Sequence, residues 1–218
     1  MIDKFVPTLG DAMAGIKDGS TILLAGFKAG MPEALVAGLI EQGARELTLV
    51  CNAGGGDDGP TADLLSTGHI RKLVCSFVRS ASVAGRLAHE GKLELEIVPQ
   101  GTLAERIRAA GAGIQAFYTP TAADTILAEN REVRIVNGRN CLLEYPLPGD
   151  VALVDAWEAD RWGNLTHRES ARNFNPIMAM AAALTIVQTR HVVGLGDIPP
   201  ASVHTPGVFV HRVLHVPA

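Results

Sequence analysis

The chain has few aromatic residues and little net charge. Phenylalanine, tryptophan and tyrosine make up only 5% of its 218 residues, so the core must be built mainly from leucine, valine, isoleucine and alanine. The net charge of −4 produces no field that would attract nucleic acid or an anionic lipid surface. We therefore expect neither nucleic acid nor a membrane as a partner. An anionic ligand would have to be bound locally, by backbone amides or by individual Lys and Arg side chains.

Cysteine is also scarce, and the spacing of its three copies excludes two classes of site. Cys51, Cys75 and Cys141 form no CxxC pair, which argues against a disulfide framework and against a structural zinc site. Cys51 lies beside a glycine-rich segment and could be a nucleophile, but no histidine is close to it in sequence, so a small buried strand-end residue is the favoured interpretation. His211 and His215 are four residues apart in a segment that reads as a strand, where this spacing does not indicate a metal. We expect no metal and no resident cofactor.

Long apolar runs and targeting signals are missing as well. Residues 178–187 form the clearest apolar stretch, and they are too few to cross a bilayer, which takes about 20 residues. The N-terminal segment has no basic stretch followed by an apolar one, so it resembles neither a signal peptide nor a transit peptide. The expected compartment is the cytoplasm.

Short β-rich runs alternate with helical patterns along the chain, which is typical of a mainly parallel sheet flanked by helices. We predict an α/β fold with an open, mainly parallel sheet and a single domain over residues 1–218. The expected strands are residues 21–24, 47–50, 72–77, 93–98, 151–155, 184–189 and 209–216. The expected helices are residues 9–16, 33–40, 103–110 and 175–183. Residues 134–136 and 141–144 are expected to form a hairpin about Asn137-Gly138, and residues 109–120 to be irregular.

Three of the predicted strands end in residues that could bind a ligand. The first is followed by Gly26-Phe27-Lys28-Ala29-Gly30, where glycines let the backbone approach a ligand and the next helix presents its N-terminus. The second is followed by Asn52 and the third by Gln100, both amides. Open α/β sheets bind ligands outside the carboxyl ends of their strands, so the three together indicate a site for a carboxylate, a thioester or a phosphate. An ordinary glycine-rich turn and turn-capping amides are the alternative interpretation.

The sequence contains none of the common motifs for dinucleotide binding, for nucleoside triphosphate binding or for a hydrolase nucleophile. Residues 111–116 match GxGxxA, but a helix precedes them where the dinucleotide fingerprint requires a strand. The glycine loop lacks the Lys-Ser/Thr ending of a Walker A loop, and no GxSxG elbow is present.

Several longer stretches carry a more specific signal. They are IVPQGTLAERIR at 97–108, GAGI at 111–114, FYTPT at 117–121, DRWGNLT at 160–166, ARNFNPIM at 171–178 and TPGVFV at 205–210. In order and wording they resemble the A subunits of the 3-oxoacid CoA-transferases, most closely those of the 3-oxoadipate type. The resemblance covers essentially the whole chain.

This resemblance implies a partner, the B subunit of the transferase, and acyl-CoA and short carboxylic acids as substrates. In that family a B-subunit glutamate in a Ser-Glu-Asn-Gly motif attacks the acyl-CoA thioester, and coenzyme A is a substrate rather than a cofactor. No such motif occurs in this chain, so no catalytic residue is expected in it. The resemblance assigns substrate positioning to Gly26, Phe27, Lys28, Ala29, Gly30, Asn52, Gly54 and Gln100.

The chain also departs from the family pattern near this expected site. In the glycine loop, Ala25 and Lys28 replace glycines and the loop looks shorter than that of the family. Ala53 replaces a second asparagine, Ala122-Ala123-Asp124-Thr125 replaces a glycine-rich stretch, and residues 80–91 look shortened. We hypothesise that Lys28 brings a positive charge to the pocket, with a solvent-facing lysine as the equal alternative. The expected reaction moves CoA from succinyl-CoA to a short 3-oxo acid, 3-oxoadipate being the first choice. The alternatives are transfer to acetoacetate or another acid, hydrolysis of a CoA ester, and a non-catalytic scaffold role.

Overall fold

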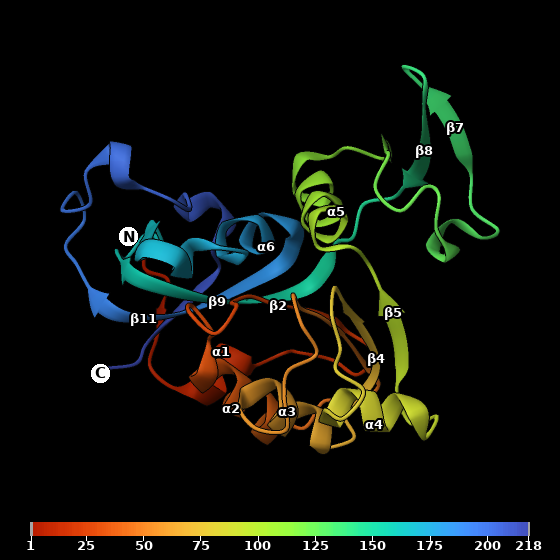
Figure 1. Cartoon of the computed structure of the whole chain (residues 1–218). Coiled ribbons are helices and arrows are strands. Elements are labelled where there is room, and N and C mark those ends of the chain that lie inside the picture. The colour runs from red at the N-terminus through yellow and green to blue at the C-terminus, as the bar shows by residue number, and fades with distance from the viewer. Residues whose placement is uncertain (1, 218) are drawn as a thin grey trace.

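The computed structural model describes residues 2–217 and consists of one large sheet covered by helices on both faces (Figure 1). The strands of the large sheet follow the order β1-β12-β11-β9-β2-β3-β4-β5, and β10 pairs with β9. Every pairing in this sheet is parallel except that of β10 with β9. The predicted α/β fold with an open, mainly parallel sheet is confirmed.

The elements alternate between strand and helix over the first half of the chain. The strands are β1 Phe5–Val6, β2 Thr21–Leu24, β3 Leu47–Val50, β4 Ile70–Cys75, β5 Glu94–Ile97, β6 Phe117–Thr119, β7 Val133–Val136, β8 Arg139–Glu144, β9 Gly149–Ala159, β10 Leu165–Thr166, β11 Ala182–Val192 and β12 Arg212–His215. The α-helices are α1 Leu9–Met13, α2 Glu33–Gln42, α3 Pro60–Ser66, α4 Val83–His89, α5 Gln100–Ala112 and α6 Asn175–Ala181. Single 3₁₀ turns are η1 Ile126–Ala128, η2 Glu169–Arg172, η3 Pro200–Ser202 and η4 Gly207–Phe209.

Helices α1 to α4 cover one face of the sheet, and α5 and α6 cover the other (Figure 1). Leucines of α2 and α3 pack on the first face, against the alternate side chains of β2, β3 and β4. Leu103 and Ile107 of α5 and Met178 of α6 are fully buried on the second face. The core is mainly aliphatic on both faces, with Phe174 as a buried aromatic residue on the second, as the scarcity of aromatic residues leads us to expect.

Several element boundaries differ from those expected. Helix 9–16 ends at Met13 because Gly15 takes a left-handed conformation with φ +85°. The helix expected at 103–110 begins at Gln100, directly after Pro99, and runs to Ala112, where Gly113 ends it with φ +72°. The segment expected to be irregular, residues 109–120, therefore contains the end of α5 and also β6. The closing strand is shorter than residues 209–216 because η4 occupies Gly207–Phe209.

A second, three-stranded antiparallel sheet of order β6-β8-β7 projects from the body beyond α5 (Figure 1). Its β7–β8 hairpin turns at Asn137 and Gly138, both with positive φ, as the sequence predicts.

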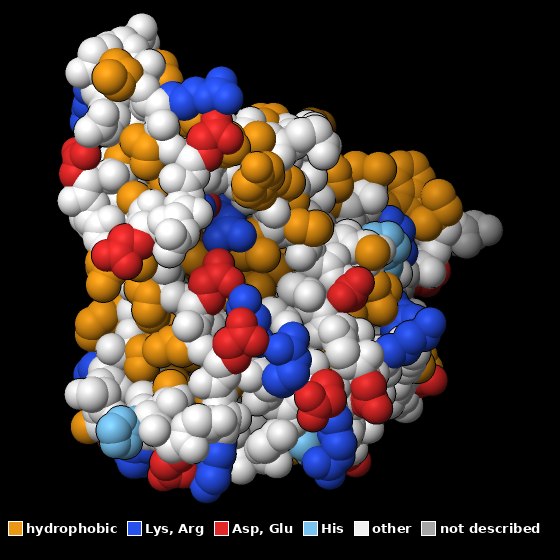
Figure 2. Space-filling model, turned by 90° about the vertical axis from the view of Figure 1, so that its right-hand side faces the viewer, with side chains coloured by type: hydrophobic (Ala, Val, Ile, Leu, Met, Phe, Trp, Pro, Cys, Tyr) orange, Lys and Arg blue, Asp and Glu red, His pale blue; other side chains and the backbone are white. Residues whose placement is uncertain are grey.

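The neighbouring edge of the large sheet, at β5, carries alternating charges. Lys72 bridges Glu94 and Glu96, and Glu96 also pairs with Arg106. In Figure 2, which views the molecule from this side, Lys, Arg, Asp and Glu side chains lie beside one another over the body. A charged edge strand discourages pairing with another sheet. Over residues 2–217 the structure has no helix that is both long and apolar enough to span a bilayer.

Candidate functional site

The centre of the sheet contains its topological switch point. From β2 the chain adds β3, β4 and β5 on one side, whereas β9, β11 and β12 lie on the other. Ligands of open α/β sheets bind at such a point, outside the carboxyl ends of the strands. Here the sheet also opens locally: β2 pairs with β9 only as far as Leu153, and β10 pairs with β9 only from Glu158 onward. The stretch of β9 between them has no strand neighbour on that side.

Side chains replace the missing strand at this opening. The backbone N–H of Asp155 donates to Asn175 Oδ1 at 2.8 Å, and the carbonyl oxygen of Asp155 lies 2.9 Å from His167 Nδ1. A buried backbone group without a partner is costly, so these two side chains are what allow β9 to continue past the end of β2. Specific hydrogen bonds from Asn175 and His167 thus stabilise the opening as part of the fold.

The glycine loop leaves β2 at this point and folds tightly on itself. The Phe27 N–H donates to the Ala29 carbonyl at 3.1 Å. Gly26 has φ +98°, and a Cβ there would lie 2.6 Å from the Met31 Cα. Gly30 has φ +71°, and a Cβ there would lie 2.5 Å from the Ala171 carbonyl oxygen. Both positions require glycine for conformation and for space.

Two asparagines from the ARNFN stretch fasten this loop to η2 and α6. Asn173 Nδ2 donates to the Ala29 carbonyl at 2.9 Å. Asn175 Nδ2 donates to the carbonyls of Gly30 at 3.1 Å and Ala171 at 2.8 Å. Asn175 is fully buried, and its Oδ1 and Nδ2 both have partners. Two segments about 145 residues apart are therefore held in one arrangement.

The N-terminus of α2 is not open to a ligand, contrary to the expectation that its first amides are free. Gln188 Oε1 accepts hydrogen bonds from the N–H groups of Ala34 at 3.0 Å and Leu35 at 3.4 Å. Gln188 Nε2 donates to Asp155 Oδ1 at 2.8 Å. The sequence could not reveal this, because Gln188 comes from β11, more than 150 residues away.

Asn52 and Gln100 form a second group, at the carboxyl ends of β3 and β5. Gln100 Nε2 donates to Asn52 Oδ1 at 2.7 Å, and the Ser76 hydroxyl, which follows β4, donates to the Asn52 carbonyl at 2.5 Å. Asn52 is 3% exposed, whereas Gln100 is exposed. Because its Oδ1 is fixed by Gln100, the Asn52 side chain has a set orientation. No acceptor among residues 2–217 is bonded to its Nδ2, so this donor remains for a ligand.

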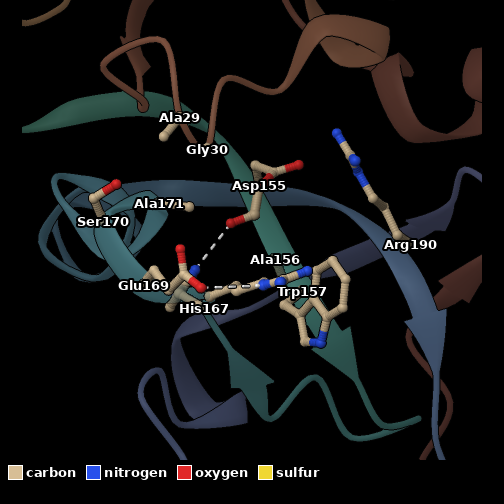
Figure 3. Close-up of a pocket in the computed structure, with 11 residues that line it drawn as sticks. Ala29, Gly30, Asp155, Ala156, Trp157, His167, Glu169, Ser170, Ala171 and Arg190 are labelled. Atoms are coloured by element: carbon tan, nitrogen blue, oxygen red, sulfur yellow. Dashed lines mark hydrogen bonds and ion pairs between the residues drawn. The ribbon is translucent and has the colours of Figure 1, made fainter. Parts of the chain in front are cut away.

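A cavity of about 290 Å³ lies at the opening of the sheet, which we call the switch-point pocket (Figure 3). It is lined by Ala29 and Gly30 of the glycine loop, residues 155–157 of β9, residues 167–171 and Arg190 of β11. The eight predicted site residues therefore fall into two groups. Ala29 and Gly30 line this pocket, with Gly26, Phe27 and Lys28 on the same loop. Asn52, Gly54 and Gln100 lie on the neighbouring strand ends and do not line it.

Sequence reasoning missed the residues that contribute charge to this pocket. Asp155 and Arg190 lie in or beside segments that the sequence pattern assigned only to buried strands. Glu169 lies in the stretch between two recognised motifs. Its backbone has φ +49°, which is unusual for a residue other than glycine. Lys28 is exposed with φ +61°, which agrees with a solvent-facing lysine and leaves its charge accessible to an approaching anion.

The histidine at the base of the pocket is buried and neutral. His167 is 5% exposed, and its Nε2 lies 2.9 Å from Thr205 Oγ1. With Nδ1–H donated to the Asp155 carbonyl, Nε2 accepts from the threonine hydroxyl. Burial lowers the pKa of His167 from 6.5 to about 4, and the positive charge of Arg172 acts in the same direction more weakly. The imidazole therefore supports β9 as an uncharged residue.

Stability should fall on acidification because of this histidine. Its pKa is lower in the folded than in the unfolded chain, so the unfolded chain binds the extra proton first. The contribution of the neutral imidazole to the free energy of unfolding is therefore complete above pH 6.5 and is lost as the pH falls toward 4. Its size is about 3 kcal/mol at 1.36 kcal/mol per pKa unit. Urea unfolding at pH 7 and pH 4.5 should show a smaller pH effect for His167→Gln than for the wild type, whereas the exposed His89→Gln control should behave as the wild type. Equal pH effects in all three proteins would contradict this role.

Cys51, which the sequence offered as a possible nucleophile, proves to be a structural residue. Cys51 is buried at the end of β3, and burial raises the pKa of its thiol, so it is not an activated nucleophile. Residues 2–217 hold no group of three or more His, Cys, Asp or Glu side chains that could bind a metal. Ala122 lines a second cavity with Pro99, Arg131 and Glu144, at the base of the three-stranded sheet.

Comparisons with known proteins agree with this fold and motif pattern. The profile described as coenzyme A transferase matches residues 6–215. The chain is 52% identical to the A subunit of 3-oxoadipate CoA-transferase from Pseudomonas putida, over 99% of this chain and 95% of that protein. It is 44% identical to the probable A subunit of succinyl-CoA:3-ketoacid coenzyme A transferase from Bacillus subtilis, over 97% of this chain and 89% of that protein. An acyl-CoA transferase structure from Escherichia coli O157:H7 has the same fold, with a TM-score of 0.87 at 20% identity, covering 98% of this chain and 47% of that one.

Proposed function

The chain belongs to the coenzyme A transferase family, and on this premise we propose that it is the A subunit of a two-subunit enzyme that moves CoA from succinyl-CoA to 3-oxoadipate. The observation that carries the proposal is the 52% identity to the corresponding subunit of a 3-oxoadipate CoA-transferase over nearly the whole length of both proteins. The proposed compartment is the cytoplasm.

The proposed reaction proceeds through the glutamate of the B subunit. Its carboxylate attacks the thioester carbonyl of succinyl-CoA and releases the CoA thiolate, which forms a mixed anhydride. The thiolate then attacks the glutamyl carbonyl, releasing succinate and leaving a glutamyl-CoA thioester. The acceptor carboxylate and the thiolate repeat these steps in reverse order, which yields the new acyl-CoA and restores the glutamate. Covalent catalysis of this kind divides one difficult exchange into easier steps.

This chain would contribute the positioning groups around that glutamate. The glycine loop leaves β2 and the Asn52–Gln100 pair sits on the next strands, so both present polar groups at the same edge of the sheet. The Asn52 Nδ2 donor is available to a carbonyl or carboxylate oxygen, since the opposite side of the amide is held by Gln100 and Ser76. Orienting reactants in this way lowers a barrier by about 7–11 kcal/mol in the best cases.

The assay that tests this proposal uses the chain with and without a B-type partner carrying the Ser-Glu-Asn-Gly motif. We expect transfer of CoA from succinyl-CoA to 3-oxoadipate only from the mixture, measured by chromatography of the CoA esters. The reason is that the attacking carboxylate comes from the other chain. Transfer by this chain alone would contradict the assignment.

The same assay separates the alternative functions. Faster turnover with acetoacetate than with 3-oxoadipate would assign the chain to the 3-ketoacid type. Cleavage of the CoA ester with water alone would identify a hydrolase. A mixture that is inactive with every acid would leave only a scaffold function.

A further inference from the structure

The switch-point pocket has the size of a site for a small acid. Its volume of about 290 Å³ is at the lower end of the range of small-molecule sites, about 300–1,000 Å³. That space suits a short carboxylic acid and excludes the nucleotide half of coenzyme A. The glycine loop, where we expect the reacting carbonyl group, forms one wall of the pocket. One part of a substrate could therefore occupy the pocket while its reacting carbonyl group lies at the loop.

Most charged groups of this pocket already have partners. Arg168 lies 4.7 Å above the ring of Trp157, and its Nε is 3.6 Å from Glu169 Oε1. Asp155 accepts a hydrogen bond from Gln188. The Arg168 charge is therefore compensated within the chain, whereas the Asp155 carboxylate has a neutral amide as its hydrogen-bond partner and is influenced by the positive charge of Arg190.

Arg190 is the exception. It is exposed at the far end of β11, and no carboxylate of residues 2–217 lies within ion-pair distance of its guanidinium. Its side chain extends along the side of the pocket opposite Ser170 and Ala171, with Asp155 between it and the glycine loop (Figure 3). The Arg190 guanidinium has five donors and no side-chain hydrogen bond or ion pair with residues 2–217, although its charge acts on the Asp155 carboxylate. At the rim of a cavity, such a fork of donors matches the geometry of a carboxylate.

We propose that the switch-point pocket binds the distal carboxylate of a dicarboxylic acyl group and that Arg190 pairs with it. This inference rests on the proposed function and deepens it, because 3-oxoadipate and succinate both have a second carboxylate whereas acetoacetate has none. Arg190 is then the residue that distinguishes dicarboxylic from monocarboxylic acids. The reacting carboxylate then lies at the glycine loop and the distal one lies across the pocket, beside Arg190 of β11.

The test compares acids in the complex of this chain with its B subunit. In Arg190→Gln, kcat/KM for 3-oxoadipate and for succinyl-CoA should each fall about tenfold, which is about 1.4 kcal/mol. The value for acetoacetate should stay within about twofold, since each substrate reacts in its own half-reaction. Arg190→Lys keeps the charge and should retain most of the preference for the dicarboxylic acid. Arg108→Gln, on the exposed side of α5, is the control and should change neither value.

The outcomes are distinguishable from failure of the proposed function. A wild-type complex that transfers CoA to no acid would refute the function itself. If the wild type is active, equal losses for 3-oxoadipate and acetoacetate in Arg190→Gln would overturn the proposed subsite, as would no loss for either acid. A loss in Arg190→Lys as large as that in Arg190→Gln would overturn the role of the charge.

Discussion

Replacing Gly30 with alanine is expected to reduce transferase activity of the assembled enzyme about 100-fold, the cost of displacing a positioning element by about 1 Å. The left-handed backbone at this position penalises any Cβ by about 1–2 kcal/mol. In addition, the new Cβ would lie 2.5 Å from the Ala171 carbonyl oxygen and 2.8 Å from Asn175 Nδ2, so the loop must move away from η2. The measurements are kcat of the complex and urea unfolding of the variant.

Gly19 provides a matched control for this substitution. It has φ +77°, close to that of Gly30, but a Cβ there would meet no atom within 4 Å. Gly19→Ala should therefore cost only the backbone contribution of about 1–2 kcal/mol and leave kcat unchanged. If Gly30→Ala behaves like Gly19→Ala in both assays, contact between the glycine loop and η2 has no role in the reaction.

Replacing Asn175 with aspartate is expected to destabilise the protein by about 3 kcal/mol and to lower kcat, although the two side chains have nearly the same shape. The amide nitrogen that donates to the carbonyls of Gly30 and Ala171 would become an oxygen that repels both. The side chain is fully buried, so water cannot compensate. A protonated carboxyl group at this position would restore at most one of the two bonds. Unfolding at pH 7 measures the first effect, and kcat of the folded complex measures the second.

The control for this variant is the same chemical change at an exposed position. Asn140 Nδ2 donates to Asp124 Oδ1 at 2.8 Å on the projecting three-stranded sheet. Asn140→Asp also replaces a donor by a carboxylate oxygen, here beside the Asp124 carboxylate but in solvent, where the cost should stay below about 1 kcal/mol. Equal destabilisation by both variants would mean that burial and the glycine loop do not determine the effect at Asn175.

The sequence predicted the fold class because that information is local. Buried strands at 21–24 and 47–50 match the structure residue for residue, and Gly43 ends α2 in a left-handed conformation as its position after the helical pattern indicates. Each of these features depends on residues within one element and its flanking turn. The same locality explains why Asn52 and Gln100 could be recognised as amides at strand ends. The hydrogen bond between them joins residues 48 apart in sequence and depends on the tertiary structure.

Boundaries were less predictable where a distant segment decides them. The sequence pattern indicated short strands at 151–155 and 184–189, but β9 and β11 each run for 11 residues. They extend because they pair with each other over most of their length, and Leu184, for example, lies opposite Val151.

The charged pocket belongs entirely to the tertiary structure. Asp155 and Arg190 come from separate strands, and only the pairing of β9 with β11 places them on one cavity. The early end of β2 then leaves β9 without a neighbour, and that vacancy is filled by His167 and Asn175 from later in the chain. The sequence by itself determined the sheet, its helices and the glycine loop, since periodicity and turn chemistry are local. Strand pairing decided where the sheet opens and placed Arg190 beside the opening. Pairing depends on the free energy of the whole packed core, which no local pattern contains.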